Sequence, residues 1–282
     1  MQPETFGSGE PSSQHATDAE LAELTAFAET LADAARAAIL PFFRAQNEIE
    51  NKAKAGFDPV TAADRAAEAA MRELIGRKYP KHGIIGEEMP EKKSRCGLSW
   101  VLDPIDGTRA FIAGLPLWGV LIALVQEGRP VIGVIDQPYM GERFIGYPGG
   151  ATFKRTGENE RPLSTRACGQ LRDAVVMTTD PYILTAPELH GFDQIRAASK
   201  LTRYGADCYA YAMLAMGHVD LVIESGLKQY DVAALIPVIE GAGGLVTNWR
   251  GGPASMGGQV IASGDPRAHA QALVALRRAA AP

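Results

Sequence analysis

The chain has 282 residues, of which 46% are hydrophobic and 22% are charged, and its formal net charge is -5. This composition fits a soluble globular protein with one large domain or two smaller ones, and the acidic balance argues against nucleic acid or an anionic membrane as the main partner. No run of about 18 apolar residues occurs, which excludes a membrane-spanning helix.

The N-terminal residues 1–16 are rich in Gly, Ser, Pro and Gln, and we expect a disordered tail there. The segment has no basic stretch before an apolar core, so we expect no secretory signal and a cytoplasmic location. Cys96, Cys168 and Cys208 are odd in number and far apart, which predicts free thiols. The five histidines show no ligand spacing, so any metal should be held by oxygen.

Two helices are expected near the start of the chain. Residues 17–20 have the pattern of a capping box, and the apolar residues behind them recur at helical spacing over 18–45, with a bend at Pro41. A loop rich in Gly and Pro at 51–61 separates this helix from a second one over 62–78.

Acidic residues stand at the ends of the next elements. Asp64 lies in the first turn of the second helix, where the helix dipole alone could explain a carboxylate. A short strand over 84–88 ends in Glu87 and Glu88. Paired glutamates are usually solvated surface, but a strand leading directly into them also fits a functional site.

The stretch 100–108 holds two closely spaced acidic residues at the end of an expected strand. The apolar run 100–102 predicts a buried strand that stops at Asp103-Pro104, because proline cannot extend a central ladder. Asp103 and Asp106 then stand three residues apart on the exit turn. Hard divalent cations favour such closely spaced oxygen ligands.

Two neighbouring features would complete such a site. The backbone carbonyl of Ile105 offers another oxygen, and Gly107 lets the backbone approach a ligand, with N–H groups after it that can receive a phosphate. The alternative is an ordinary strand-end turn, in which Asp, Pro and Gly are common.

The remaining chain predicts a layered fold. Strands are expected over 117–125, 130–136, 142–147, 151–154, 174–178, 221–224, 245–249 and 260–263, and helices over 207–217, 231–240 and 266–280. The polar stretch 156–172 suggests a boundary between an N-terminal half at 17–160 and a C-terminal half at 161–282. An antiparallel portion followed by alternating helices and strands predicts an α+β or layered α/β sandwich.

Four acid-bearing motifs, taken together, resemble the inositol monophosphatase superfamily of Mg²⁺-dependent, lithium-sensitive phosphatases. They are residues 58–64, 86–88, 103–108, and 230–234 with 240–244. They stand in the family's order and spacing, with Tyr230 in place of the usual tryptophan. The resemblance implies the alternating αβαβα sandwich of the inositol monophosphatase and fructose-1,6-bisphosphatase type.

The resemblance also implies a metal centre of two or three Mg²⁺ ions. Glu87, Asp103 and the Ile105 carbonyl would hold the first ion. Asp103 would bridge to a second ion, held also by Asp106 and Asp231, and the catalytic Glu87 would help to hold a third. The ions would activate a water molecule and neutralise the phosphate oxygens.

Further roles follow from the same resemblance. Thr108 would position the attacking water, with Asp64 as the proton acceptor through the hydroxyl, and the N–H groups of Gly107 and Thr108 would hold the phosphate at a helix N-terminus. Attack would be in line, without a phosphoenzyme. Either Lys52 or Lys54 would correspond to the family's loop lysine.

Finer motifs look like the histidinol-phosphatase branch of the superfamily. They are residues 114–119, 133–138 and 203–209. Asp207 and Glu224 are candidates for binding the ammonium and imidazole of histidinol phosphate, since carboxylates suit both groups. Asp207 could instead be a helix N-cap, and Glu224 a solvated strand end. Arg109 would contact either the phosphate or a subunit interface.

Two other functions compete with this interpretation. One is an inositol-1-monophosphatase or another small-molecule phosphatase of the superfamily, and the other is a phosphatase-like binding protein without activity. The expected partner is a small phosphorylated substrate, without nucleic acid or membrane, and the resemblance implies a homodimer. Mg²⁺-dependent phosphate release separates the enzyme from the binding protein.

Overall fold

The computed structural model describes residues 17–45, 49–51 and 59–280 of the chain. The predicted tail at 1–16 lies outside these ranges. None of the helices within them combines the length and the apolar character that crossing a lipid bilayer requires.

The larger sheet has seven strands in the order β3-β4-β5-β6-β7-β8-β9. The strands are β3 (Gly83–Gly86), β4 (Leu98–Asp106), β5 (Gly119–Gln126), β6 (Arg129–Gln137), β7 (Glu142–Tyr147), β8 (Gly150–Arg155) and β9 (Arg161–Pro162). Only β3 and β4 pair in parallel. Trp100 and Leu102 face one side of the sheet and Val101 the other, and all three are buried. Burial on both faces explains why the central strands are apolar without alternation.

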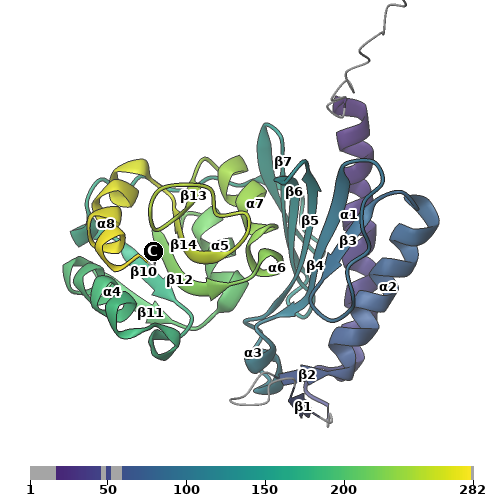
Figure 1. Ribbon diagram of the computed structural model, residues 1–282, viewed down its shortest axis with the longest axis horizontal. Coiled ribbons are helices and arrows are strands. Elements are labelled where there is room, and N and C mark those ends of the chain that lie inside the picture. The colour runs from purple at the N-terminus through teal and green to yellow at the C-terminus, as the bar shows by residue number, and fades with distance from the viewer. Residues whose placement is uncertain (1–16, 46–48, 52–58, 281–282) are drawn as a thin grey trace, which may run out of the picture.

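Helices α1 (Asp18–Ile39) and α2 (Ala62–Lys78) cover one face of this sheet (Figure 1). Thr17 caps α1 in the predicted capping box. The helix ends earlier than predicted, because a 3₁₀ turn at Leu40–Phe42 follows it. Pro41 in that turn has no N–H to continue the α-helical hydrogen bonds.

The second sheet has five strands in the order β11-β10-β12-β14-β13. The strands are β10 (Val175–Thr178), β11 (Leu201–Tyr204), β12 (Leu221–Leu227), β13 (Leu245–Asn248) and β14 (Gly258–Ser263). β10 is parallel to β11 and β12, and β14 is antiparallel to β12 and β13.

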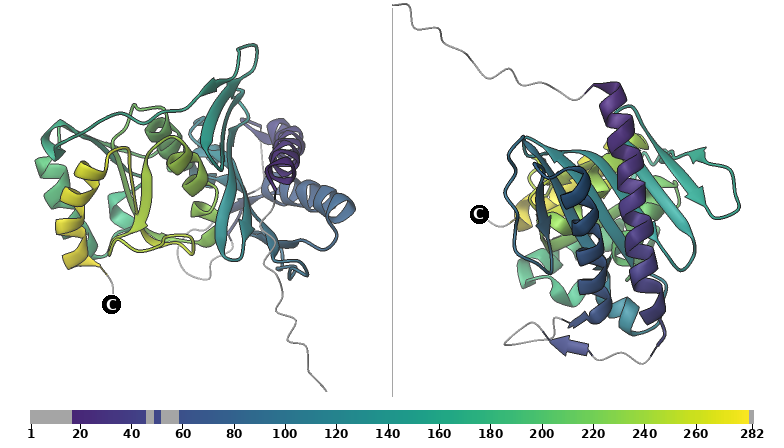
Figure 2. Two further views of the ribbon diagram at one scale, coloured as in Figure 1. Left: turned by 90° about the horizontal axis from the view of Figure 1, so that it is seen from above. Right: turned by 90° about the vertical axis from the view of Figure 1, so that its right-hand side faces the viewer.

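Helices of the second half lie on both sides of this second sheet. On the outside, α4 (Ala186–Ala198) and α8 (Pro266–Ala279) pack against it. On the inside, α5 (Asp207–Ala215) and α7 (Leu235–Gly241) are buried between the two sheets. Figures 1 and 2 show the resulting order of helix, sheet, helix, sheet and helix layers, which confirms the predicted sandwich.

Two further predicted elements differ from the structure. β4 does not stop at Asp103-Pro104 but continues to Asp106, because its register against β5 shifts between Asp103 and Asp106 and leaves Pro104 outside the ladder. The helix predicted over 231–240 is two helices, α6 (Gln229–Val232) and α7. The short α3 (Thr108–Ile112) follows β4 directly and begins where the resemblance implied a helix N-terminus, at Gly107 and Thr108.

Some elements were not predicted at all. They include α4, β9, β11, and the hairpin strands β1 (Ile49–Asn51) and β2 (Pro59–Thr61). The division into halves at 17–160 and 161–282 remains a prediction. The two sheets lie on either side of it, except that β9 at 161–162 pairs with β8.

Candidate active site

A cavity of about 240 Å³ lies where the end of β4 meets α3, α5, α6 and the end of β10. Figure 1 shows α6 beside β4, on the side of the larger sheet that faces the second sheet. Among the described residues, every site residue predicted from the sequence except Asp64 lines this cavity: Glu87, Asp103, Ile105, Asp106, Gly107, Thr108, Arg109, Asp207, Glu224 and Asp231. The fold therefore brings together motifs that are far apart in the sequence.

Three carboxylates form the centre of the cavity. Asp103, Asp106 and Asp231 each offer an oxygen, and these oxygens lie within 4.8 Å of one another. Burial raises the pKa of Asp103 well above its usual value, and the nearby carboxylate of Glu87 raises it further. Burial also raises the pKa of Asp106 well above its usual value, and the nearby carboxylate of Asp207 raises it further. Buried like charges at this spacing are unfavourable unless a cation compensates them, so the donor set fits a hard divalent ion.

Backbone contacts hold these three carboxylates in place. An oxygen of Asp103 accepts the N–H of Ile105 at 3.1 Å, inside the irregular end of β4. Asp106 accepts the N–H of Cys208 at 2.6 Å, which connects the first sheet to the start of α5. Asp231 accepts the N–H of Lys228 at 2.6 Å in the first turn of α6.

Glu68 was not predicted, yet it supports the segment that carries Glu87. Its buried carboxylate accepts the N–H of Glu88 at 2.7 Å and that of Met89 at 3.2 Å, and it pairs with Arg72. The signal was present in the sequence, because Glu68 stands four residues after Asp64 on the same helical face.

Gly86 is tightly packed against this carboxylate. A Cβ at Gly86 would stand 2.1 Å from an oxygen of Glu68, whose position is fixed by hydrogen bonds. Gly86→Ala should therefore destabilise the protein by about 1–3 kcal/mol in denaturant unfolding. Gly76→Ala is the matched control. No atom lies within 4 Å of a Cβ added at this helical position, so the substitution should increase the free energy of unfolding by about 0.5–1 kcal/mol. Equal effects at the two sites would contradict the packing argument.

Asp64 and Thr108 do not contact each other directly. One oxygen of Asp64 accepts the N–H and hydroxyl of Thr61, at 2.8 and 2.7 Å, in a capping box. Its other oxygen is buried and has no partner among the described residues. The Thr108 hydroxyl donates to the carbonyl of Ile105 at 3.0 Å. Burial raises the pKa of Asp64, against the opposing effect of Thr61. The predicted relay between Thr108 and Asp64 remains a prediction.

Asp207 lines the cavity beside Gly107. The N-cap of α5 is Ala206, and no side chain caps this helix, so the alternative role of Asp207 as an N-cap is wrong. Its carboxylate lies 3.1 Å from the place where a Cβ of Gly107 would stand. Burial, reinforced by Glu224 and opposed by Arg109, raises the pKa of Asp207 to about 7.

Glu224 is also buried, with only 4% of its surface exposed, so the alternative of a solvated strand end is wrong. Both of its oxygens accept hydrogen bonds from the protein, from Thr179 and from Tyr211. Arg109 lies close enough to lower the pKa of Asp207, although the structure does not test the role predicted for it. Lys52 and Lys54 lie outside the described residues.

The cavity has a wall that sequence reasoning missed. Thr179, Asp180, Ile183 and Leu227 line it beside the predicted residues. The sequence held a hint of this wall. Asp180-Pro181 comes just after β10, and the same dipeptide, Asp103-Pro104, occurs in β4 at the predicted metal site. Without a motif around it, that dipeptide could not be distinguished from an ordinary turn.

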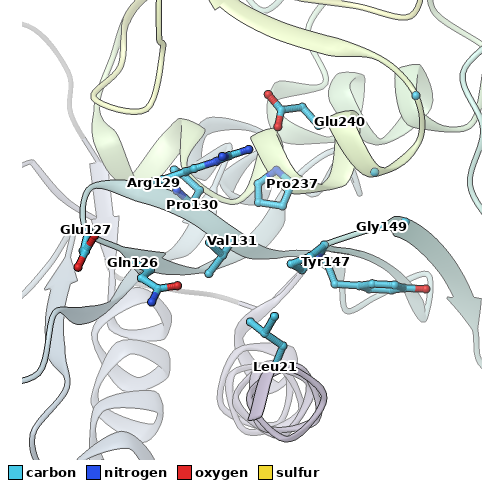
Figure 3. Close-up of a pocket in the computed structure, with 14 residues that line it drawn as sticks. Leu21, Gln126, Glu127, Arg129, Pro130, Val131, Tyr147, Gly149, Pro237 and Glu240 are labelled. Carbon is cyan, nitrogen blue, oxygen red and sulfur yellow. The ribbon is translucent and has the colours of Figure 1, made fainter. Parts of the chain in front are cut away.

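A larger cavity of about 740 Å³ lies elsewhere, between α7, the β5–β6 turn and the start of α1 (Figure 3). It is lined by Leu21, Val131, Tyr147 and Pro237, with Arg129 and Glu240 at its edge. None of the predicted site residues lines it. Cavity size therefore does not identify the chemistry of this molecule, whereas the carboxylate cluster does.

Comparisons with known proteins agree with the geometry. A model described as the inositol monophosphatase family matches residues 20–281. The chain is 44% identical over 271 residues to the bifunctional phosphatase IMPL2, chloroplastic, of Arabidopsis thaliana, covering 92% of this chain and 77% of that protein. It is 38% identical over 208 residues to a histidinol-phosphatase of Chlorobaculum parvum, covering 73% of this chain and 79% of that protein. A solved structure of an inositol monophosphatase from Zymomonas mobilis has a TM-score of 0.81 and 44% sequence identity. The match covers 91% of this chain and 98% of that one.

Proposed function

Because the chain belongs to the inositol monophosphatase family, we propose that it is a Mg²⁺-dependent phosphatase that hydrolyses histidinol phosphate to histidinol and phosphate. The observation that carries the substrate assignment is the carboxylate of Asp207 beside the phosphate-binding turn at Gly107. Histidinol phosphate carries an ammonium and an imidazole, and a carboxylate is a suitable partner for either. The similarity to the Chlorobaculum parvum histidinol-phosphatase supports this choice.

Inositol 1-phosphate is the main competing substrate. The Zymomonas mobilis structure, an inositol monophosphatase, is as similar in sequence as the plant phosphatase. An inositol ring presents hydroxyl groups, which can donate hydrogen bonds to the carboxylate of Asp207, whereas an ammonium or imidazolium group adds an ion pair to its hydrogen bond. The chemistry of this wall therefore favours the cationic substrate.

The metal-binding residues in this proposal are Glu87, Asp103, Asp106, Asp231 and the carbonyl of Ile105. The oxygens of three of them, Asp103, Asp106 and Asp231, already lie within 4.8 Å of one another. When bound, Mg²⁺ would supply charge neutralisation for the phosphate and acidify a water molecule. The carbonyl of Ile105 keeps a lone pair for this task while its other lone pair receives the Thr108 hydroxyl.

The protein's own residues would direct the attack. The hydroxyl of Thr108 would accept a hydrogen bond from the attacking water. Its own proton, turned away from the Ile105 carbonyl, would pass to the free oxygen of Asp64 as the water gives up its proton to the hydroxyl. The water oxygen bonds to phosphorus as the opposite ester bond breaks, and the leaving alkoxide takes a proton from solvent. Gly107, at a φ of 88°, turns the backbone so that the N–H groups at the start of α3 can receive phosphate oxygens.

Asp207→Ala tests the substrate assignment. A charge-assisted contact contributes about 1.5–3 kcal/mol, so kcat/KM for histidinol phosphate should fall about ten- to a hundredfold. Hydrolysis of p-nitrophenyl phosphate, which has no cation, should keep its rate. Equal losses for both substrates would make Asp207 a structural residue, and no loss for either would favour the inositol phosphate.

A further inference from the structure

The segment that carries Glu87 is a short loop at the end of β3. The N–H of Glu87 still donates to the carbonyl of Leu102 in β4, at 3.3 Å. The chain returns to β3 at Lys92, whose backbone exchanges two hydrogen bonds of 2.8 Å with Ile84. Residues 87–91 lie between these two anchors, so the backbone groups of the loop need partners from another element.

One ion pair on α2 supplies those partners. The carboxylate of Glu68 accepts the N–H of Glu88 at 2.7 Å and that of Met89 at 3.2 Å. The guanidinium of Arg72 donates to the carbonyls of Met89 and Pro90, both at 3.0 Å, and to the carboxylate of Glu68 at 2.7 Å. Two side chains that hold each other thus also hold four backbone groups of the loop.

A second pair on α2 shows what is particular about the first. Glu73 and Arg77 have the same spacing along the helix, but their side chains are 60% and 73% exposed. The side chain of Glu68 is fully buried and that of Arg72 is 16% exposed. Exposed pairs at this spacing contribute little, whereas a buried pair with all of these hydrogen bonds fixes a defined geometry.

Glu87 depends on such support more than the other predicted metal ligands do. The oxygens of Asp103, Asp106 and Asp231 converge without any ion, and Glu87 lines the same cavity but does not belong to this group among the described residues. Asp103 and Asp106 lie within β4, whereas Glu87 is the first residue of the loop. The place of its carboxylate therefore depends on how the loop is held.

We infer that Glu68 and Arg72 are positioning residues: their ion pair holds the 87–91 loop so that Glu87 presents its carboxylate to a divalent ion, and it thereby sets the affinity for that ion. The inference rests on the proposed function, in which Glu87 is a metal ligand. Neither member of the pair is among the residues that line the cavity, so the pair acts through the backbone of the loop rather than on the ion or the substrate.

Mn²⁺ binding to the purified full-length protein tests this role. Mn²⁺ suits the same oxygen ligands as Mg²⁺, and its EPR signal reports the free ion. Groups that orient a metal ligand change the affinity about 10–100-fold. Glu68→Gln should therefore raise the Kd about tenfold or more, because its NH₂ group replaces an oxygen that accepts from the loop.

Glu73→Gln is the matched control, because it makes the same chemical change in the exposed pair of the same helix. Its Kd should stay within about twofold of the wild type. Asp103→Asn should lose the measured site. Equal Kd values in Glu68→Gln and Glu73→Gln would overturn the inference.

Variants of Arg72 cover the case in which Glu68→Gln does not fold. Arg72→Met keeps an apolar stem but removes the donors to the two loop carbonyls, and should raise the Kd about tenfold. Arg72→Lys, which keeps the charge and can still donate to a carbonyl, should fall between Arg72→Met and the wild type. Arg77→Met is the control and should bind as the wild type does. A wild-type Kd in Arg72→Met would contradict the positioning role.

Kinetics separate a positioned metal ligand from a general loss of structure. In Arg72→Met, the Mg²⁺ concentration for half-maximal phosphate release should rise with the Kd, while kcat at saturating Mg²⁺ stays within about threefold of the wild type. A loss of kcat that saturating Mg²⁺ does not restore would overturn the inference. If the wild type itself binds no Mn²⁺, the proposed function fails together with this inference. If the wild type binds Mn²⁺ and the Glu68 and Arg72 variants bind it equally well, the inference alone fails.

Discussion

Asp103→Asn should abolish phosphate release, lowering kcat by about 10³-fold or more. Asp103 is 1% exposed and shares a cluster of converging oxygens with Asp106 and Asp231. Replacing its carboxylate by an amide removes one negative charge from a site that must neutralise a divalent ion, and several kcal/mol of transition-state stabilisation are lost with the ion. Steady-state phosphate release at saturating Mg²⁺ measures the effect.

The same variant should increase the stability of the metal-free protein. In excess chelator, Asp103→Asn should unfold at a higher temperature than the wild type, since it removes a buried charge surrounded by other carboxylates. Glu73→Gln serves as a control, because Glu73 pairs with Arg77 on the exposed surface of α2 and lies outside the cavity. Wild-type activity in Asp103→Asn would overturn the assignment of the metal site.

Thr108→Ala should lower kcat by about 10²-fold, because the positioning of the water and the transfer of its proton would both suffer. Among the described residues, the hydroxyl of Thr108 makes one hydrogen bond, to the Ile105 carbonyl, so its loss should leave the fold intact. Thr108→Ser, which keeps the hydroxyl, is the matched control and should stay within about tenfold of the wild type.

Asp64 gives this prediction a second, independent check. If Asp64 accepts the proton through Thr108, then Asp64→Asn and Thr108→Ala should not add in the double variant. Asp64 has one buried oxygen without a hydrogen-bond partner among the described residues, and this is the structural reason to expect Asp64 and Thr108 to act together. Wild-type turnover in Thr108→Ala, or fully additive losses, would show that Thr108 does not position the water.

Much of the site could be predicted because its acids follow strongly patterned elements. Glu87 follows an apolar strand, Asp103 and Asp106 flank the end of another, and Asp64 starts a helix with clear periodicity. In a layered sandwich the ends of such strands gather between the sheets, so acids placed there converge. The motif pattern then identified which acids belong together.

Other parts depend on tertiary contacts that leave no local pattern. The bulge that carries β4 past Pro104 depends on its pairing with β5, and the left-handed turn at 205–207 depends on contacts with Thr178 and Thr179. Sequence propensity would not place Ala206 at a φ of 84°. The engagement of Glu224 by Tyr211 likewise joins two elements that only the folded chain brings together.

Phosphate release from three substrates tests the central assignment most directly. Histidinol phosphate, inositol 1-phosphate and adenosine 3′,5′-bisphosphate would be compared with purified protein in Mg²⁺ and again in excess chelator. We expect the highest kcat/KM for histidinol phosphate, by about tenfold or more, and no turnover of any substrate in chelator. Preference for inositol 1-phosphate would contradict the proposed substrate, and undiminished activity in chelator would contradict the metal-dependent mechanism.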